Sequence, residues 1–232
     1  MPFFRQWWRA AWHIAFPRLC LHCRRQSAVR NHHFCMTCLM DYVETDYHLH
    51  PDNPVAMHFY GRVPIERATS LLDYKKGQLS QTLLRQFKYE GRVDIGRILG
   101  KRLGEKMKES GFLKGIQGII PVPLHPKKRR LRGFNQSFIF AEGLEEVSHC
   151  PVKNHWIRRH EFTSSQTKKT RLQRIENVSN AFSLQPNIEE IPPGHYLLVD
   201  DVVTTGATLE AVAKVCLDSN DVKLSVASIA LG

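Results

Sequence analysis

Short apolar runs that alternate with helical patterns constrain the fold of this 232-residue chain more than any other feature. Three runs are typical of buried strands: 118–123 (GIIPVP), 195–200 (HYLLVD) and 223–231 (KLSVASIAL). Amphipathic helical patterns precede or separate them, at 78–91, 93–110, 134–147 and 207–219. Alternating strands and helices predict a parallel α/β sheet, and ligands bind such sheets at the carboxyl ends of the strands.

The strand at 195–200 leads into two adjacent acids, Asp200 and Asp201, and then into a turn rich in threonine and glycine. Backbone N–H groups at the start of a helix attract anions, and Gly206 permits close approach, so this turn suits a phosphate monoester. Carboxylates do not bind phosphate, so we expect the acids to accept hydrogen bonds from ribose hydroxyls and to help hold Mg²⁺. The alternative is that they only cap the helix and compensate its dipole.

After the strand at 118–123 we expect a strongly basic loop, which contains Lys127, Lys128, Arg129, Arg130 and Arg132. Arginine binds phosphate oxygens in bidentate fashion, so these side chains suit a multiply charged anion. The same run could instead be a solvated loop or a contact for DNA phosphates. The net charge of +11 is compatible with a nucleic acid, a phosphorylated metabolite or a membrane surface as partner.

Four cysteines near the start of the chain form two C-x2-C pairs that are separated by eleven residues: Cys20, Cys23, Cys35 and Cys38. Each pair can bind one metal ion from a tight turn, and four thiolates complete a tetrahedral shell, so we predict a structural zinc site. Two disulfides are the alternative, which a reducing cytosol disfavours. One of three nearby histidines could also replace a cysteine as ligand.

The N-terminal stretch is aromatic, because Phe4, Trp8, Trp12 and Phe16 recur every four residues along one helical face. Three roles are open for this face: it packs on the rest of the protein, lies on a membrane surface, or stacks on nucleic-acid bases. Prolines near residue 51 mark a boundary, so we expect two domains: residues 1–50, with this helix and the zinc site, and residues 55–232. No run reaches the roughly 18 apolar residues of a membrane span. We therefore expect a cytoplasmic protein without stable membrane insertion.

The stretch LLVDDVVTTGATL at 197–209 closely resembles the motif that binds 5-phosphoribosyl 1-pyrophosphate (PRPP) in type I phosphoribosyltransferases. Together with IIPVPLHPKKRRLRGFNQS at 119–137, SQTKKTRLQRIENVSNAF at 165–182 and the four cysteines, it resembles the competence protein F (ComF) family over nearly the whole chain. The resemblance implies an α/β fold, with a type I phosphoribosyltransferase-like parallel sheet flanked by helices and preceded by a small zinc-knuckle or zinc-ribbon-like domain. It also implies a link to DNA uptake in natural transformation.

The resemblance also implies which residues form the site. The expected catalytic residues are Asp200, Asp201 and Arg132. Closure of the loop at 165–182 would exclude water from a reacting centre with oxocarbenium character. Lys88 and Tyr89 match the family too, and either contact substrate or only end a packed helix. PRPP would be bound by Val199, Asp200, Asp201, Thr204, Thr205, Gly206, Ala207 and Thr208, and its pyrophosphate and the closing loop would involve Lys127, Arg129, Arg132, Asn135, Gln136, Gln166 and Arg174.

Two functions follow from these features. The first is Mg²⁺-dependent transfer of the ribosyl 5-phosphate from PRPP to an acceptor, with release of pyrophosphate. The second is a single-stranded DNA-binding competence factor in which PRPP binding is regulatory or vestigial, with competence or DNA-processing proteins as further candidate partners. A purely structural adaptor would leave the string of acids and threonines unexplained. No stretch of the sequence identifies the acceptor.

Overall fold

A computed structural model describes the chain except for residues 1–18, 26–27, 29–32, 76–78 and 161–180. Its centre is a four-stranded sheet in the order β1-β6-β5-β2, in which every pairing is parallel. These strands are β1 (Ala68–Asp73), β2 (Ile116–Pro121), β5 (Gly194–Val203) and β6 (Val222–Leu231). The strand order is not sequential, as expected for parallel strands, which need crossover connections.

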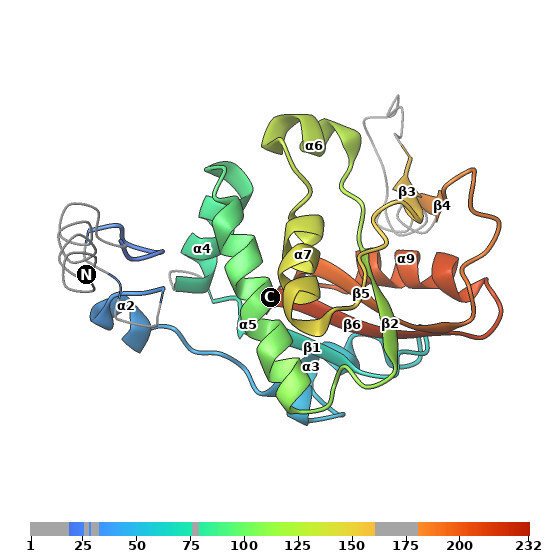
Figure 1. Ribbon diagram of the computed structural model, residues 1–232, viewed down its shortest axis with the longest axis horizontal. Coiled ribbons are helices and arrows are strands. Elements are labelled where there is room, and N and C mark those ends of the chain that lie inside the picture. Colours follow the sequence, from blue (N-terminus) through green and yellow to red (C-terminus); the bar gives the residue numbers. More distant parts are fainter. Residues whose placement is uncertain (1–18, 26–27, 29–32, 76–78, 161–180) are drawn as a thin grey trace, which may run out of the picture.

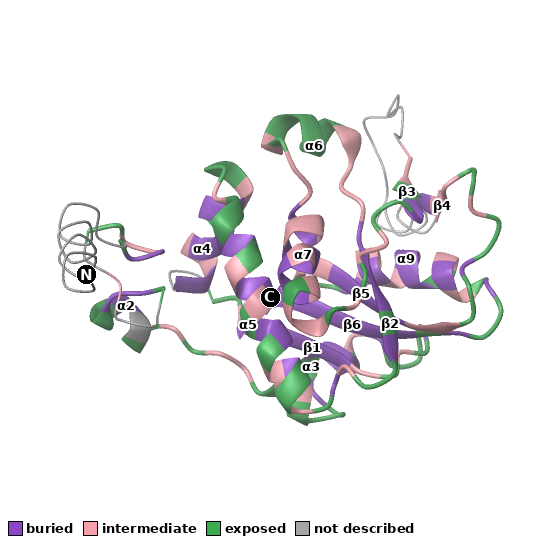
Figure 2. Ribbon diagram, viewed as in Figure 1, coloured by how far each residue is buried: buried purple, intermediate pink, exposed green. Residues whose placement is uncertain are grey.

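Apolar side chains cover both faces of the sheet, because successive residues of a strand point to opposite sides. In β5, Leu197 and Val199 belong to one apolar cluster, whereas Tyr196 and Leu198 belong to the other. The first cluster lies under three helices: α4 (Leu79–Tyr89), α5 (Val93–Glu109) and α7 (Gln136–Ser148). The second lies under α9 (Ala207–Leu217). Figure 2 shows the resulting buried core on both sides of the strands.

Helices α5 and α7 pack side by side across one face of the sheet (Figure 1). Two glycines permit this close approach, since a Cβ on Gly100 would overlap the backbone of α7 and a Cβ on Gly143 would overlap the backbone of α5. The crossing holds the amino end of α7 above the carboxyl ends of β2 and β5, where the predicted site residues lie.

We expected a loop for the basic segment after β2, but this segment forms the seven-residue helix α6 (Pro126–Arg132). Pro126 opens this helix, a position where proline is favoured, and the His125 ring nitrogen accepts a hydrogen bond from the Lys127 N–H at 3.2 Å. Gly133 ends the helix in the left-handed conformation. In Figure 1, α6 stands apart from the sheet at the top of the molecule.

The remaining elements are short. Helix α2 (Met36–Met40) contains Cys38, and the 3-10 helix η1 (Tyr47–Leu49) and helix α3 (Pro54–Met57) lie between α2 and β1. Strands β3 (Ile157–Arg159) and β4 (Phe182–Leu184) form a separate antiparallel pair.

The four-cysteine unit packs on the same core as helix α4. Cys20, Cys35 and Cys38 belong to the apolar cluster that contains Leu83 and Phe87 of α4. Polar contacts join them too, since the Gln86 amide donates to the His22 carbonyl at 3.2 Å. The architecture of the fold prediction, a parallel α/β sheet flanked by helices and preceded by a four-cysteine unit, is confirmed. The division between residues 50 and 55 stays a prediction.

The expected N-terminal aromatic helix lies outside the described residues, as does the loop that contains Gln166 and Arg174. Within the residues that the structure describes, no helix has the length and apolar character needed to cross a membrane.

Candidate functional site

Strand β5 extends beyond the end of its pairing with β2. The register between them runs to Pro121 and Val199, and the Val122 N–H adds a last hydrogen bond to the Val199 carbonyl at 2.9 Å. Beside β6, however, β5 continues to Val203. The two acids that follow Val199 therefore lie where β2 turns away toward α6. This is the carboxyl-end position at which parallel sheets bind ligands.

Asp200 is held in place from helix α7. Its Oδ1 accepts hydrogen bonds from the Ser137 hydroxyl at 2.9 Å and from the Asp201 N–H at 2.8 Å. Desolvation of the carboxylate, reinforced by the adjacent charge of Asp201, raises the pKa of Asp200 to about 7. A carboxyl group with this pKa exchanges its proton near neutral pH, and a bound cation would favour its ionised form.

Asp201 is held from helix α4 by an ion pair in which Oδ2 lies 3.0 Å from Lys88 Nζ. Only 19% of the Lys88 side chain and 15% of the Asp201 side chain are exposed, so water screens the pair weakly. The two residues also line a cavity of about 550 Å³ beside the end of β5. That Lys88 contacts substrate stays a prediction. The structure places the Lys88 side chain against Asp201, one of the two predicted site acids.

The turn after β5 is fixed from the side of α3. Gly206 adopts a left-handed conformation (φ 73°), and a Cβ there would approach His58 Cβ to 3.3 Å. The Arg62 guanidinium donates to the Thr205 carbonyl at 2.8 Å and forms an ion pair with Glu210 in the first turns of α9. These contacts rigidify the turn and leave the side chains of Thr204 and Thr205 exposed.

Helix α9 begins directly after this turn, and its N-cap residue is Gly206, which has no side chain that could cap the helix. Asp200 is instead engaged by Ser137, and Asp201 by Lys88. The geometry therefore does not favour helix capping as the role of the two acids. The first-turn N–H groups of an 11-residue helix carry partial positive charge, which suits an anionic ligand.

At the junction of α6 and α7, Arg132 is half-buried and lies against Tyr89 at the end of α4. Its guanidinium donates to Gln136 Oε1 at 2.9 Å and lies 5.2 Å from the centre of the Tyr89 ring. The Asn135 amide donates to the Val122 carbonyl at 3.0 Å. Among the described atoms, Arg132 Nε, Asn135 Oδ1 and Gln136 Nε2 are buried without a hydrogen-bond partner. Such groups are costly unless a ligand or water satisfies them.

The structure thus gathers most of the predicted residues at one edge of the sheet. Val199 is buried beneath the acids, and Ala207 and Thr208 lie in the first turn of α9. Lys127 and Arg129 project from α6 and are exposed. Sequence reasoning missed the supporting roles of Ser137, Arg62 and Glu210. Ser137 ends the quoted basic motif, but no local pattern signals the other two.

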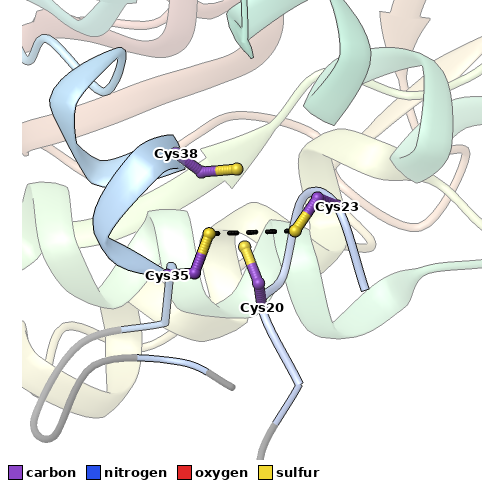
Figure 3. A group of neighbouring side chains, drawn as sticks. All are labelled: Cys20, Cys23, Cys35 and Cys38. Carbon is purple, nitrogen blue, oxygen red and sulfur yellow. Dashed lines mark hydrogen bonds between the residues drawn. The ribbon is translucent and has the colours of Figure 1, made fainter. Parts of the chain in front are cut away.

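The four cysteines form a compact thiol cluster (Figure 3). Their sulfur atoms all lie within 4.8 Å of one another, and Cys23 Sγ and Cys35 Sγ are 3.8 Å apart. None of the four is part of a disulfide, so the structure does not form the two alternative disulfides. His22 Nδ1 lies 3.2 Å from Cys38 Sγ, but His22 is not one of the four clustered side chains that could together hold a metal ion. Four sulfur ligands at this separation fit one tetrahedral metal ion such as zinc.

Fold and site together define a parallel α/β protein with a carboxylate pair at a strand end and an attached four-cysteine cluster that could hold a metal ion. Competence protein F of Haemophilus influenzae is 34% identical over 135 residues, which cover 57% of this chain and 59% of that protein. DNA utilization protein YhgH of Escherichia coli O157:H7 is 31% identical over 216 residues, which cover 88% of this chain and 92% of the relative. Competence protein ComFC of Bacillus subtilis is 35% identical over 113 residues, which cover 49% and 43%. The chain belongs to this family of competence and DNA utilization proteins.

No protein-family model matches the chain. Among solved structures, the allosteric regulatory enzyme of purine biosynthesis has a TM-score of 0.39 and 15% identity, over 61% of this chain and 29% of that one. Similarity of this extent supports no inference about the site. The functional interpretation therefore rests on the family and on the geometry described above.

Proposed function

We propose that the protein binds PRPP at the end of β5 and transfers its ribosyl 5-phosphate group to an acceptor, in the context of DNA uptake or use. One observation carries the proposal: Asp200 and Asp201 lie where β2 has left the sheet, two residues before a rigid Thr-Thr-Gly turn that leads into α9. The acids suit ribose hydroxyls, and the turn suits a phosphate. The names of the relatives, competence protein F and DNA utilization protein, support the biological context.

Each residue has a distinct task in this proposal. Residues 204–208 bind the 5-phosphate through backbone N–H groups and threonine hydroxyls, while Asp200 and Asp201 accept hydrogen bonds from the ribose. Arg132, with Asn135 and Gln136 beside it, faces the pyrophosphate and stabilises the charge that develops as it leaves. In the transfer, the C1–O bond breaks with its electron pair going to pyrophosphate, and a lone pair of the acceptor forms the new bond to C1.

Two metal ions complete the proposal. The thiol cluster holds zinc in a structural role, since four sulfur ligands leave no open position for chemistry. Mg²⁺ would supply charge neutralisation to the pyrophosphate when bound. The carboxylates fit this ion, because a bound cation would offset the desolvation and the adjacent Asp201 charge that raise the pKa of Asp200. We place the protein in the cytoplasm, with a boundary between the zinc unit and the sheet domain near residue 50.

Single-stranded DNA binding is the second candidate function, and the surface of α6 favours it. Lys127, Lys128, Arg129 and Arg130 are all exposed on this short helix. Binding through phosphate contacts falls steeply with salt, so affinity for an oligonucleotide should drop by one or two log units over a modest rise in ionic strength. A Lys127→Gln/Arg129→Gln variant would lose this affinity while still binding PRPP if the two functions use different residues.

Calorimetric titration with PRPP and Mg²⁺ tests the first proposal. Micromolar binding by the zinc-loaded protein, abolished in Asp200→Asn/Asp201→Asn, is the expected result. Asp218→Asn removes an exposed acid after α9 and serves as the matched control. Absence of binding at millimolar PRPP would overturn the proposal and leave DNA binding as the favoured function.

A further inference from the structure

The cavity of about 550 Å³ beside the end of β5 extends from the proposed PRPP site toward helix α4. It shares Asp201 and Thr204 with that site. Its opposite wall comes from α4, through Leu84, Arg85 and Lys88, and from the segment after β1, through Tyr74. A ligand in this cavity would therefore lie directly beside a ribose bound at Asp200 and Asp201.

The walls suit a flat ring. Tyr74 and Tyr89 both line the cavity, and Leu84 and Val202 add apolar surface to its walls. Tyrosine rings stack on flat heterocycles with little loss of conformational freedom. Tyr89 is kept in place by the Arg132 guanidinium over its ring. The volume exceeds what one heterocyclic ring requires and falls within the range of small-molecule sites.

The charges favour an acid over a neutral ring. Among the described residues that line the cavity, Arg85 and Lys88 are cationic and Asp201 is the one carboxylate. Asp201 is already paired with Lys88, whereas the Arg85 side chain is 67% exposed and its guanidinium lies 3.3 Å from Glu90 Oε1. Exposed pairs of this kind are weak, so an anionic group of a ligand can recruit Arg85.

The chemistry sets a separate requirement, which concerns the attacking ring nitrogen. A ring nitrogen that still carries a proton needs a base as its bond to C1 forms. The Asp201 carboxylate is already engaged in its ion pair with Lys88, and the cavity walls in the described part of the chain include no histidine. A ring whose attacking nitrogen carries no proton uses its own lone pair, and no proton has to be removed. The C1–O electron pair leaves with pyrophosphate as before.

We propose that this cavity is the acceptor site and that it takes a planar nitrogen heterocycle bearing an acidic group, with Tyr74 as stacking wall and Arg85 as the residue that selects the acid. The proposal deepens the phosphoribosyl-transfer function and rests on it for the identity of the reaction. The binding of the ring itself can be measured without PRPP.

Matched pairs of probes test this selection. Nicotinate and nicotinamide share one ring and differ by acid and amide, and orotate and uracil differ by one carboxylate. We expect at least one acid to bind the wild-type protein about tenfold or more tightly than its neutral partner in calorimetric titration, as loss of one charged hydrogen bond implies. Arg85→Gln should remove that difference, and Tyr74→Leu should weaken both members of the pair.

Arg97→Gln is the control, because Arg97 pairs with Glu142 on the surface between α5 and α7 and does not line the cavity. Equal binding of acid and neutral partner, or binding of neither acid while PRPP still binds, would overturn the acceptor proposal and leave the PRPP proposal intact. Failure of PRPP to bind, with acid binding that depends on Arg85, would instead keep the ring site and remove its assignment to phosphoribosyl transfer.

Discussion

The thiol cluster and the strand-end site differ in how far apart their parts lie in the sequence. All four sulfurs come from residues 20–38, and two C-x2-C pairs define them completely. The strand-end site combines Lys88, Ser137 and Asp201, which stand on three different elements. Helix α4 joins the two regions, because Gln86 contacts the cysteine unit and Lys88, two residues later, contacts Asp201. A local motif predicts a metal site by itself, whereas a site built from distant elements depends on the whole fold.

The largest effect is expected from removal of one sulfur. Cys35→Ser should reduce bound zinc from one ion per chain to near zero and lower the melting temperature strongly, since structural zinc contributes on the order of 10 kcal/mol to the folding of isolated zinc peptides. Metal analysis and thermal unfolding measure both. Cys150→Ser is the control, because this half-buried thiol lies outside the cluster and serine can keep its hydrogen bond to the Ile116 carbonyl. A Cys35→Ser protein that retains zinc would contradict the four-thiolate assignment.

The next largest effect is a gain in stability, which we expect when Asp200 is replaced. Its pKa is about 7 in the folded protein and about 3.9 in an unfolded chain, so ionisation favours unfolding. The cost is absent below pH 4, grows as the pH rises, and reaches about 4 kcal/mol above pH 7. Asp200→Asn keeps an acceptor for Ser137 but does not ionise. Urea unfolding should therefore show a stability gain that is larger at pH 8 than at pH 5, and an equal gain at both would show that the pKa is not raised.

The contact between α4 and β5 is expected to contribute less. Lys88→Met leaves Asp201 unpaired beside Asp200 and should destabilise the protein by about 2 kcal/mol, between the values for exposed and buried pairs. Lys101→Met removes an exposed lysine that pairs with Glu146, and should cost under about 0.5 kcal/mol. Urea unfolding of both variants gives the comparison. Equal losses would mean that the Lys88 pair is as weak as a surface pair.

The smallest effect is expected in the turn. Gly206→Ala and Gly133→Ala both place a side chain at a positive φ, at a cost of about 1 kcal/mol. A Cβ at Gly133 meets nothing within 4 Å, whereas a Cβ at Gly206 meets His58 and Phe59 at 3.3 and 3.4 Å. Gly206→Ala should therefore be the more destabilising change in urea unfolding. The reverse order would show that the turn is not held against α3.

Much of this architecture follows from local patterns. The strands around Ile119, Leu197 and Val226 and the helices between them were predicted, because apolar periodicity specifies them directly. Strand β1 was not predicted. It is defined by its parallel pairing with β6 and not by a pattern in its own residues. Helix α6 was expected to be a loop because its charges hide the capping signals of His125 and Gly133.

Local patterns also predict only part of the candidate site. The acids and the turn were predicted because they are contiguous with a strand, and the four cysteines because of their spacing. The partners that position them were not: Ser137 is 63 positions from Asp200, and Arg62 is 143 positions from Thr205. Such pairs depend on the crossover connections of the sheet, which no local pattern encodes.

The affinity for PRPP with Mg²⁺, measured at pH 6 and pH 8, tests the role of the strand-end acids most directly. We expect up to about tenfold tighter binding at pH 8 in the wild-type protein, because a carboxyl group of pKa near 7 must ionise to accept the ligand. Any pH dependence left in Asp200→Asn reports the phosphates of the ligand itself. Binding that is lost in Asp200→Asn/Asp201→Asn would support the site, whereas wild-type affinity in that double variant would contradict it.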